Sequence, residues 1–190
     1  SYDVPSWGLR VCGDTDSTPD PSFIGKKIND IFFHRNRLGF IADENVIMSR
    51  SGEFFHFFPE TVTSTLDTDP VDVASTSKKV SILRHVISFD EDLLLFSDQT
   101  QFMLTGGTTL TASNVSINTS TEFETSTAVK PIGAGSNVFF CFPKGNYTGI
   151  REFYIAGDSD TKKADDITAN VPKFVPNNIF KLTSATNENI

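Results

Sequence analysis

Three stretches of the chain repeat one pattern: an apolar run of strand length, a short polar turn and a second apolar run. They begin at Arg37, Asp92 and Asn137, so their starts lie about 45 to 55 residues apart. Strands joined by short turns pair as antiparallel neighbours, and this spacing is typical of β-propeller blades, which stack to bury their faces. The pattern therefore predicts an all-β fold of antiparallel meander units that resemble propeller blades. A β-sandwich has similar strand spacing and is the open alternative.

The aromatic content fits stacked sheets. Phenylalanine accounts for 18 of the 190 residues, whereas tryptophan occurs once. Bulky rings favour pleated, half-buried surfaces and fill the space between twisted sheets. Apolar residues make up 38% of the chain, which is enough for the core of one domain or of a piece of a larger one.

Turn-forming residues gather near the start of the chain, where GDTDSTPDPSFIG combines Gly, Asp, Ser and Pro. We therefore expect a loop-rich connector over 1–30 and β-rich blade repeats over 31–190. The repeats are expected at about 31–58, 80–107 and 130–156, with the start of another near 179. The chain opens on SYDVPSWG and stops just after a strand-like run, so both ends look cut and a longer protein is expected.

Within these bounds some segments give individual expectations. The run Phe54–Phe58 is apolar and reads as a strand, and the polar stretch 59–79 is expected to be a long connection. Alternation at Val115–Asn118 predicts an exposed edge strand. After the strand expected at Ile150–Ile155, the chain is expected to be loop until the apolar run Ile179–Leu182.

The charge restricts the partners. The formal net charge is −8 and the sequence pI is about 4.8. An acidic chain repels phosphate backbones, so tight binding to DNA, RNA or an anionic membrane is not expected. Weak contact with a nucleic acid, without adhesion, is compatible with this charge. No apolar run has the length of a membrane span. Cys12 and Cys141 lack metal-site spacing, and two free thiols are expected, with a disulfide as the alternative.

The segment His34-Arg35-Asn36-Arg37 interrupts an aromatic stretch and is the first candidate site. One interpretation is an anion site or a contact with a neighbouring subunit. The favoured interpretation is a turn between two strands, in which Arg35 and Arg37 pair with carboxylates or stack on rings. The candidate carboxylates are Asp30, Asp43 and Glu44.

Two other patterns suggest chemistry. Gly13–Ser17 (GDTDS) and Gly157–Thr161 (GDSDT) offer alternate carboxylates as a calcium loop does, but neither has the Gly and Glu that an EF-hand needs. Turns formed by Asx side chains are therefore expected, with weak calcium binding as the alternative. The carboxylate pairs Glu122/Glu124 and Asp43/Glu44 invite comparison with a glycosidase, which places two acids across a sugar.

Sequence spacing alone does not establish such a catalytic pair, and an acidic chain contains many pairs by chance. No GxSxG, HExxH or phosphate-binding loop occurs, and the histidines lack metal spacing: His34, His56 and His85. We therefore predict a protein that is not an enzyme, without catalytic, cofactor-binding or metal-binding residues and without a cofactor.

Three segments together carry a resemblance: FHRNRLGF, ENVIMSRSGEFF and LLFSDQTQF. With DITANVPKFVPNNIF near the end, they make nearly the whole chain similar to the tail tubular B family, the nozzle proteins of short-tailed phages of the T-seven type. Family members are several times longer, so the resemblance identifies an internal fragment. It also implies a largely β protein that contains a propeller.

The same resemblance implies a function. The chain would be a structural part of a phage tail nozzle, a homo-hexameric ring below the portal and adaptor, with tail fibres attached near the adaptor. DNA would pass through the lumen during ejection without specific binding. The protein would be made in the host cytoplasm and located in the virion. A carbohydrate-binding or carbohydrate-degrading β domain is the alternative function.

A conduit for DNA gives the acidic charge a physical meaning, because basic walls would hold the phosphates. Clusters of acidic residues are expected either to line the lumen or, more simply, to face solvent. The clusters are Asp67/Asp69/Asp72, Asp90/Glu91/Asp92 and Asp158/Asp160/Asp165/Asp166.

Overall fold

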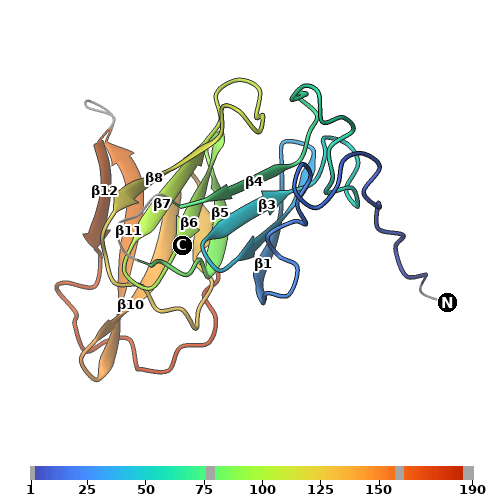
Figure 1. Cartoon of the computed structure of the whole chain (residues 1–190). Coiled ribbons are helices and arrows are strands. Elements are labelled where there is room, and N and C mark those ends of the chain that lie inside the picture. The colour runs from blue at the N-terminus through green and yellow to red at the C-terminus, as the bar shows by residue number, and fades with distance from the viewer. Residues whose placement is uncertain (1–2, 76–79, 157–160, 186–190) are drawn as a thin grey trace. The chain divides into compact units, whose positions relative to one another are not determined.

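The structure is a computed structural model that describes residues 3–75, 80–156 and 161–185. All regular elements in these ranges are strands, and they form three four-stranded antiparallel sheets (Figure 1). The predicted all-β meander architecture is thus confirmed. The described ranges contain no helix with the length and apolar character needed to cross a bilayer.

The chain divides into two compact units. Ser1–Val80 and Leu104–Asn118 form the first unit, and Ser81–Met103 and Thr119–Ile190 form the second. We describe each unit by itself.

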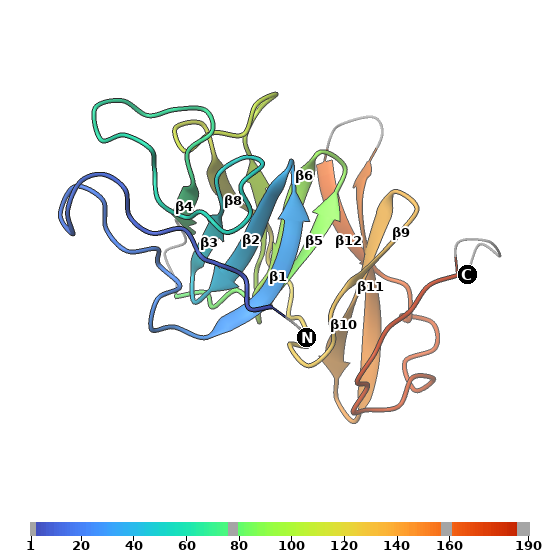
Figure 2. The same ribbon diagram turned by 90° about the vertical axis from the view of Figure 1, so that its right-hand side faces the viewer.

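The first sheet is a meander in the order β1-β2-β3-β4. Its strands, which run from blue to green in Figure 2, are β1 (Ile28–His34), β2 (Arg37–Ala42), β3 (Asn45–Met48) and β4 (Val71–Ala74). Two-residue turns join the first three strands, because Arg35, Asn36 and Asp43 adopt positive φ values of 45°, 60° and 51°. Such left-handed conformations fit the right-handed twist of paired strands and fix their register.

The second sheet has the order β5-β6-β7-β8. Its strands are β5 (His85–Phe89), β6 (Asp92–Phe96), β7 (Gln101–Thr105) and β8 (Ser116–Thr121), and the last two continue across the division between the units. Strand β8 is the edge strand expected near Val115–Asn118.

The third sheet has the order β12-β11-β10-β9. Its strands are β9 (Ile132–Ala134), β10 (Asn137–Lys144), β11 (Tyr147–Ala156) and β12 (Thr161–Asp166). In both later sheets the apolar runs occupy the central strands. One edge of each of these sheets is polar, β8 in the second and β12 in the third.

Several segments differ from the sequence-based expectations. The polar stretches that contain β4 and β12 were expected to be connections, yet both pair as edge strands. Phe54–Phe58 forms no strand, because its rings turn onto the first sheet. The run Ile179–Leu182 is irregular chain, so no further strand begins near 179 in this structure.

Aromatic and aliphatic side chains fill the core of each unit. In the first unit, Leu38, Phe40, Ala42, Ile47 and Phe57 form the buried cluster. In the second unit, the cluster brings β5, β6 and β7 against β10, β11 and β12, and its members are Phe89, Leu94, Phe96, Met103, Val138, Phe140, Phe153 and Ala164. All six residues of β2 are buried, so both faces of that strand are covered.

A phenylalanine lies directly opposite a glycine in two of the sheets. Phe32 pairs with Gly39, and Phe142 pairs with Gly149. In each pair the ring covers the glycine so closely that an added Cβ would lie 2.2 Å from a ring carbon. The absence of a side chain on one strand is therefore what lets the ring lie flat across the hairpin.

Replacing Gly39 with alanine should lower the free energy of unfolding by about 1–3 kcal/mol, because the Phe32 ring must leave its position. Urea denaturation measures this loss. Gly133→Ala is the matched control, since Gly133 also lies in a strand and an added Cβ there meets nothing within 4 Å. If Gly39→Ala cost no more than Gly133→Ala, the Phe32–Gly39 contact would not constrain the sheet.

Candidate functional site: a buried arginine network and an apolar groove

The first candidate segment is a tight turn, as favoured from the sequence. Arg35 and Asn36 are its two central residues, and His34 and Arg37 close it as the last strand pair. The Arg35 guanidinium donates to the carbonyl oxygens of Gly107 and Thr108. Arg35 therefore ties the turn to a loop of the same unit that follows it by about 70 residues in sequence.

Arg37 is one of the most buried large side chains, with 2% of its surface exposed. Its guanidinium donates to four carbonyl oxygens at 2.6 to 3.2 Å, those of Ser49, Asp67, Asp69 and Leu110. The acceptors of Arg37 are thus main-chain carbonyls and not the carboxylates that the sequence suggested. Burial lowers the pKa of Arg37, and the nearby negative charge of Asp69 opposes this shift.

The geometry explains why an arginine occupies this position. Its planar group presents five donors in a fixed fork, which can satisfy several carbonyl oxygens at once. The four acceptors come from three segments of the first unit, after β3, before β4 and in the loop after β7. Arg37 therefore satisfies polar backbone in places where no strand pairing is available.

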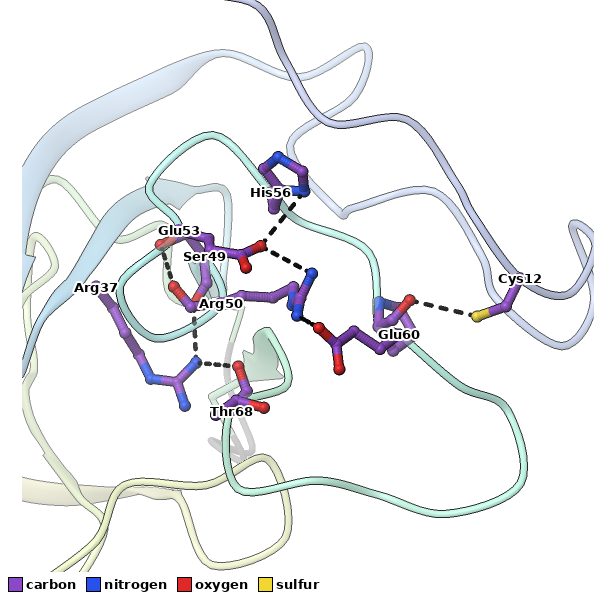
Figure 3. A network of polar contacts seen from close by, with 9 residues as sticks. Cys12, Arg37, Ser49, Arg50, Glu53, His56, Glu60 and Thr68 are labelled. Carbon is purple, nitrogen blue, oxygen red and sulfur yellow. Dashed lines mark hydrogen bonds and ion pairs between the residues drawn. The ribbon is translucent and has the colours of Figure 1, made fainter.

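A second arginine organises the loop that follows β3 (Figure 3). Arg50 forms ion pairs with Glu53, at 2.8 Å, and with Glu60. The Glu53 carboxylate also lies 3.5 Å from Nδ1 of His56, and the Cys12 thiol donates to the carbonyl oxygen of Pro59 at 3.3 Å. These contacts hold the phenylalanine-rich segment 54–58 in place.

His34 responds to the burial of this turn. Desolvation, together with the adjacent positive charge of Arg35, lowers the pKa of His34 from 6.5 to about 4. His34 is therefore neutral at pH 7. Any positive charge at the turn therefore comes from Arg35 and not from His34 at this pH.

Lowering the pH from 7 to 4 should cost about 1–2 kcal/mol of stability at His34, because the ring is only half buried and solvent screens part of the effect. The folded pKa lies below the unfolded value, so the unfolded chain binds the proton more tightly. Stability is therefore full above pH 6.5 and is lost as the pH falls toward 4. Urea denaturation of the protein and of His34→Gln across this interval measures the effect; equal pH dependence of the two would contradict it.

The other candidate residues lie apart from this network. Asp14 in the GDTDS segment forms an Asx turn, since its carboxylate accepts bonds from the backbone N–H groups of Asp16 and Ser17. Hydrogen bonds, first from Ser17, lower the pKa of Asp14. Glu122 and Glu124 are exposed. In the described ranges, no group of three or more His, Cys, Asp or Glu side chains could hold a metal ion.

The acidic clusters differ in their surroundings. Asp69 is buried near Arg37, whereas Asp67, Asp72, Asp90 and Glu91 are exposed. Asp165 accepts a hydrogen bond from Tyr154, and Asp166 accepts one from Lys144 at 2.6 Å. Asp158, Asp160 and the first four residues of GDSDT lie outside the described residues.

Both cysteines are free thiols, one in each unit. Cys141 is buried in β10, and burial raises the pKa of its thiol. Cys12 is half-buried beside Pro59. The two cysteines form no disulfide with each other in this structure, as expected from the sequence.

An apolar groove lies on the first unit, with a volume of about 610 Å³. Trp7 forms one wall, where its ring packs edge-on against Phe55 at 5.4 Å and contacts Phe40 and Phe57. Figure 2 shows the N-terminal segment that carries this ring passing over the first sheet, and the Gly8 N–H donates to the Phe55 carbonyl oxygen at 2.8 Å.

The groove escaped the sequence analysis because its walls come from separate parts of the chain. Pro21, Phe23 and Ile24 precede β1, Ile28 and Ile31 lie on β1, and Leu38 and Phe40 form part of the floor. One local signal was available. Ile31 and Phe33 alternate on the edge strand, although 58% and 62% of their respective surfaces are exposed.

Comparison with known proteins gives two findings. A family model described as "Bacteriophage nozzle protein" matches residues 1–190. The tail tubular protein gp12 of Escherichia phage T7 is 42% identical over 184 residues, which cover 96% of this chain and 23% of that protein. The chain therefore spans about a quarter of the length of the curated relative that it matches.

Proposed function

Because the chain belongs to the bacteriophage nozzle protein family, we propose that it forms a wall segment of a ring-shaped tail nozzle through which DNA leaves the virion. The chain is a structural phage tail protein and a virion component. The family match over the whole chain is the observation that carries the proposal. The ring, the conduit and the contacts within the tail are the parts that it adds.

The character of the sheets supports a role in a wall. The central strand β2 is buried over its whole length, so the first sheet has a closely packed interior. The terminal guanidinium nitrogens of Arg37 and Arg50 contact backbone carbonyls and carboxylates of the same unit, so these two side chains stabilise loops. A conduit needs such rigid, stacked layers more than it needs a reactive centre.

The charge supports passage without adhesion. The net charge is −8, and Asp72, Asp90 and Glu91 are exposed. Each basic contact would bind a phosphate and release counterions, which would slow a sliding duplex. An acidic wall repels the same phosphates, so DNA would pass without a specific site.

We extend the proposal to partners as the resemblance implies. The full protein would form a homo-hexamer that contacts the tail adaptor at one end and the tail fibres near that junction. A carbohydrate-degrading domain receives no support from the groove on the first unit, because its lining residues carry no carboxylate. A glycosidase requires a pair of them.

Electron microscopy of the purified full-length polypeptide tests the ring directly. We expect closed rings with a central channel; particles that remain single subunits at every protein concentration would contradict the proposal. The conduit is tested by adding a labelled DNA duplex to the rings. We expect no binding that strengthens as salt is lowered, because the walls present no phosphate contacts.

The turn between β5 and β6 provides a sharper test of the lumen. In the full-length protein, Asp90→Asn/Glu91→Lys would introduce a phosphate contact, and asparagine tolerates the positive φ of 54° at position 90. If the turn faces the DNA, this variant should slow ejection, and Asp90→Asn/Glu91→Gln should slow it less. Equal ejection rates for both variants and the parent would place this turn away from the lumen.

A further inference from the structure

The apolar groove leaves part of the first sheet uncovered. Phe40 pairs with Ile31 and Leu38 pairs with Phe33, so the side chains of each pair share one face. Phe40 and Leu38 are buried by the loop that carries Phe57, whereas their partners on β1 are exposed. This face of the first sheet is therefore buried at β2 and exposed to solvent at the edge strand β1.

The bare part combines two features that suit an added β-structure. The first is the apolar floor of the groove, and the second is β1 itself, which is the terminal strand of its sheet. A terminal strand presents backbone donors and acceptors on its outer side. Exposed apolar side chains beside an open edge are the surface on which a further sheet or strand packs.

The apolar lining of the groove favours contact with a segment that stays bound after the chain has folded. The lining residues include no charged side chain, and Trp7, Ile24, Ile31 and Phe55 each expose between 39% and 58% of their surface. Surfaces between separately folded partners carry a polar rim and must stay soluble before they meet. A wholly apolar groove resembles the interior of a domain, which is buried as the chain folds.

The length of the relative indicates which segment could fill the groove. The matched stretch covers 23% of the relative, so a nozzle protein of that length has about three quarters of its chain elsewhere. We propose that a β-sheet from that remainder of the same polypeptide packs into the groove against β1 and Trp7. This inference rests on family membership and on the groove, and it does not depend on the ring or the conduit.

Thiol modification of the full-length polypeptide, held as a monomer by dilution, tests the proposal. A cysteine is placed in the groove by Ile31→Cys, or by Ile24→Cys where the first variant folds poorly, in a Cys12→Ser background. Ser64→Cys is the matched control, because Ser64 is exposed in a loop of the same unit and does not line the groove. We expect the groove cysteine to react at least about tenfold more slowly than the control in the monomer.

Two results would overturn the proposal. Reaction of the groove cysteine as fast as that of the Ser64→Cys control, in the monomer and in the ring alike, would mean that the groove is open. Fast reaction in the monomer with protection only in the ring would mean that a second copy fills the groove. A failure of ring formation would refute the proposed function and leave the monomer experiment valid.

Cross-linking identifies the occupant. A benzophenone attached to the cysteine of Ile31→Cys in the full-length monomer should join residues outside the stretch described above, and the product should keep the mass of a single chain. A product with twice that mass, or cross-links only to residues within this stretch, would contradict the proposal.

Discussion

Replacing Arg37 with alanine should lower the free energy of unfolding by about 3–5 kcal/mol, the largest loss that we expect from any polar side chain of this protein. The substitution removes the donors that satisfy the carbonyl oxygens of Ser49, Asp67, Asp69 and Leu110. These oxygens would remain in a buried site without a partner, and each unsatisfied group costs about 1–3 kcal/mol. Urea denaturation followed by circular dichroism measures the loss.

Two variants separate the fork of donors from the charge. Arg37→Lys keeps the positive charge but places its three donors on one nitrogen, which cannot reach three segments, so an intermediate loss is expected. Arg35→Ala serves as the comparison, since Arg35 is only partly buried and its guanidinium donates to the carbonyl oxygens of Gly107 and Thr108. A loss for Arg37→Ala no greater than that for Arg35→Ala would show that the carbonyl network is not a major source of stability.

Replacing Phe153 with alanine should cost a similar amount, about 3–5 kcal/mol. The side chain is fully buried in the cluster that joins two sheets of the second unit, and its ring packs edge-on against Phe89 at 5.1 Å. Truncation removes the transfer free energy of the ring and leaves a cavity that rigid strands can close only in part. The same denaturation experiment measures the change.

Phe174→Ala is the matched control, because that ring is 79% exposed and its removal should change stability by less than about 0.5 kcal/mol. Phe153→Leu keeps most of the volume and should cost less than the alanine variant. If alanine and leucine were equally tolerated at position 153, the phenylalanines of this unit would not act as the packing between its sheets.

The comparison of sequence and structure separates two kinds of candidate site. The turn at Arg35 and Asn36 was predicted from local pattern, since two polar residues between apolar runs favour a hairpin. The acceptors of Arg37 were not predicted, because they are main-chain carbonyls from segments that lie 12 to 73 residues away in sequence. Only a carboxylate can be named from sequence as an arginine partner; a carbonyl oxygen is present at every residue.

The apolar residues of the groove also come together in a way that the sequence alone does not show. Trp7, Phe23 and Phe55 are unremarkable in sequence, and they form a surface only because three segments converge on the first sheet. Exposed large apolar side chains are informative, yet exposure is a property of the folded chain. The sequence could suggest an apolar edge strand at Ile31 and Phe33, and the structure was needed to show what lay beside it.

By itself the sequence determined the central strands and the turns between them, because alternation and turn chemistry act between residues that are close along the chain. Tertiary structure alone decided that the polar segments Val71–Ala74 and Thr161–Asp166 are strands, since an edge strand is held by backbone bonds to its neighbour. It also decided that Phe54–Phe58 is not a strand, because Phe54 and Phe57 pack on the sheet from a loop and the segment does not pair within one. Backbone pairing and ring packing between distant segments depend on which segments lie next to one another in the folded chain. Residues that are close along the sequence do not show which distant segments will be neighbours.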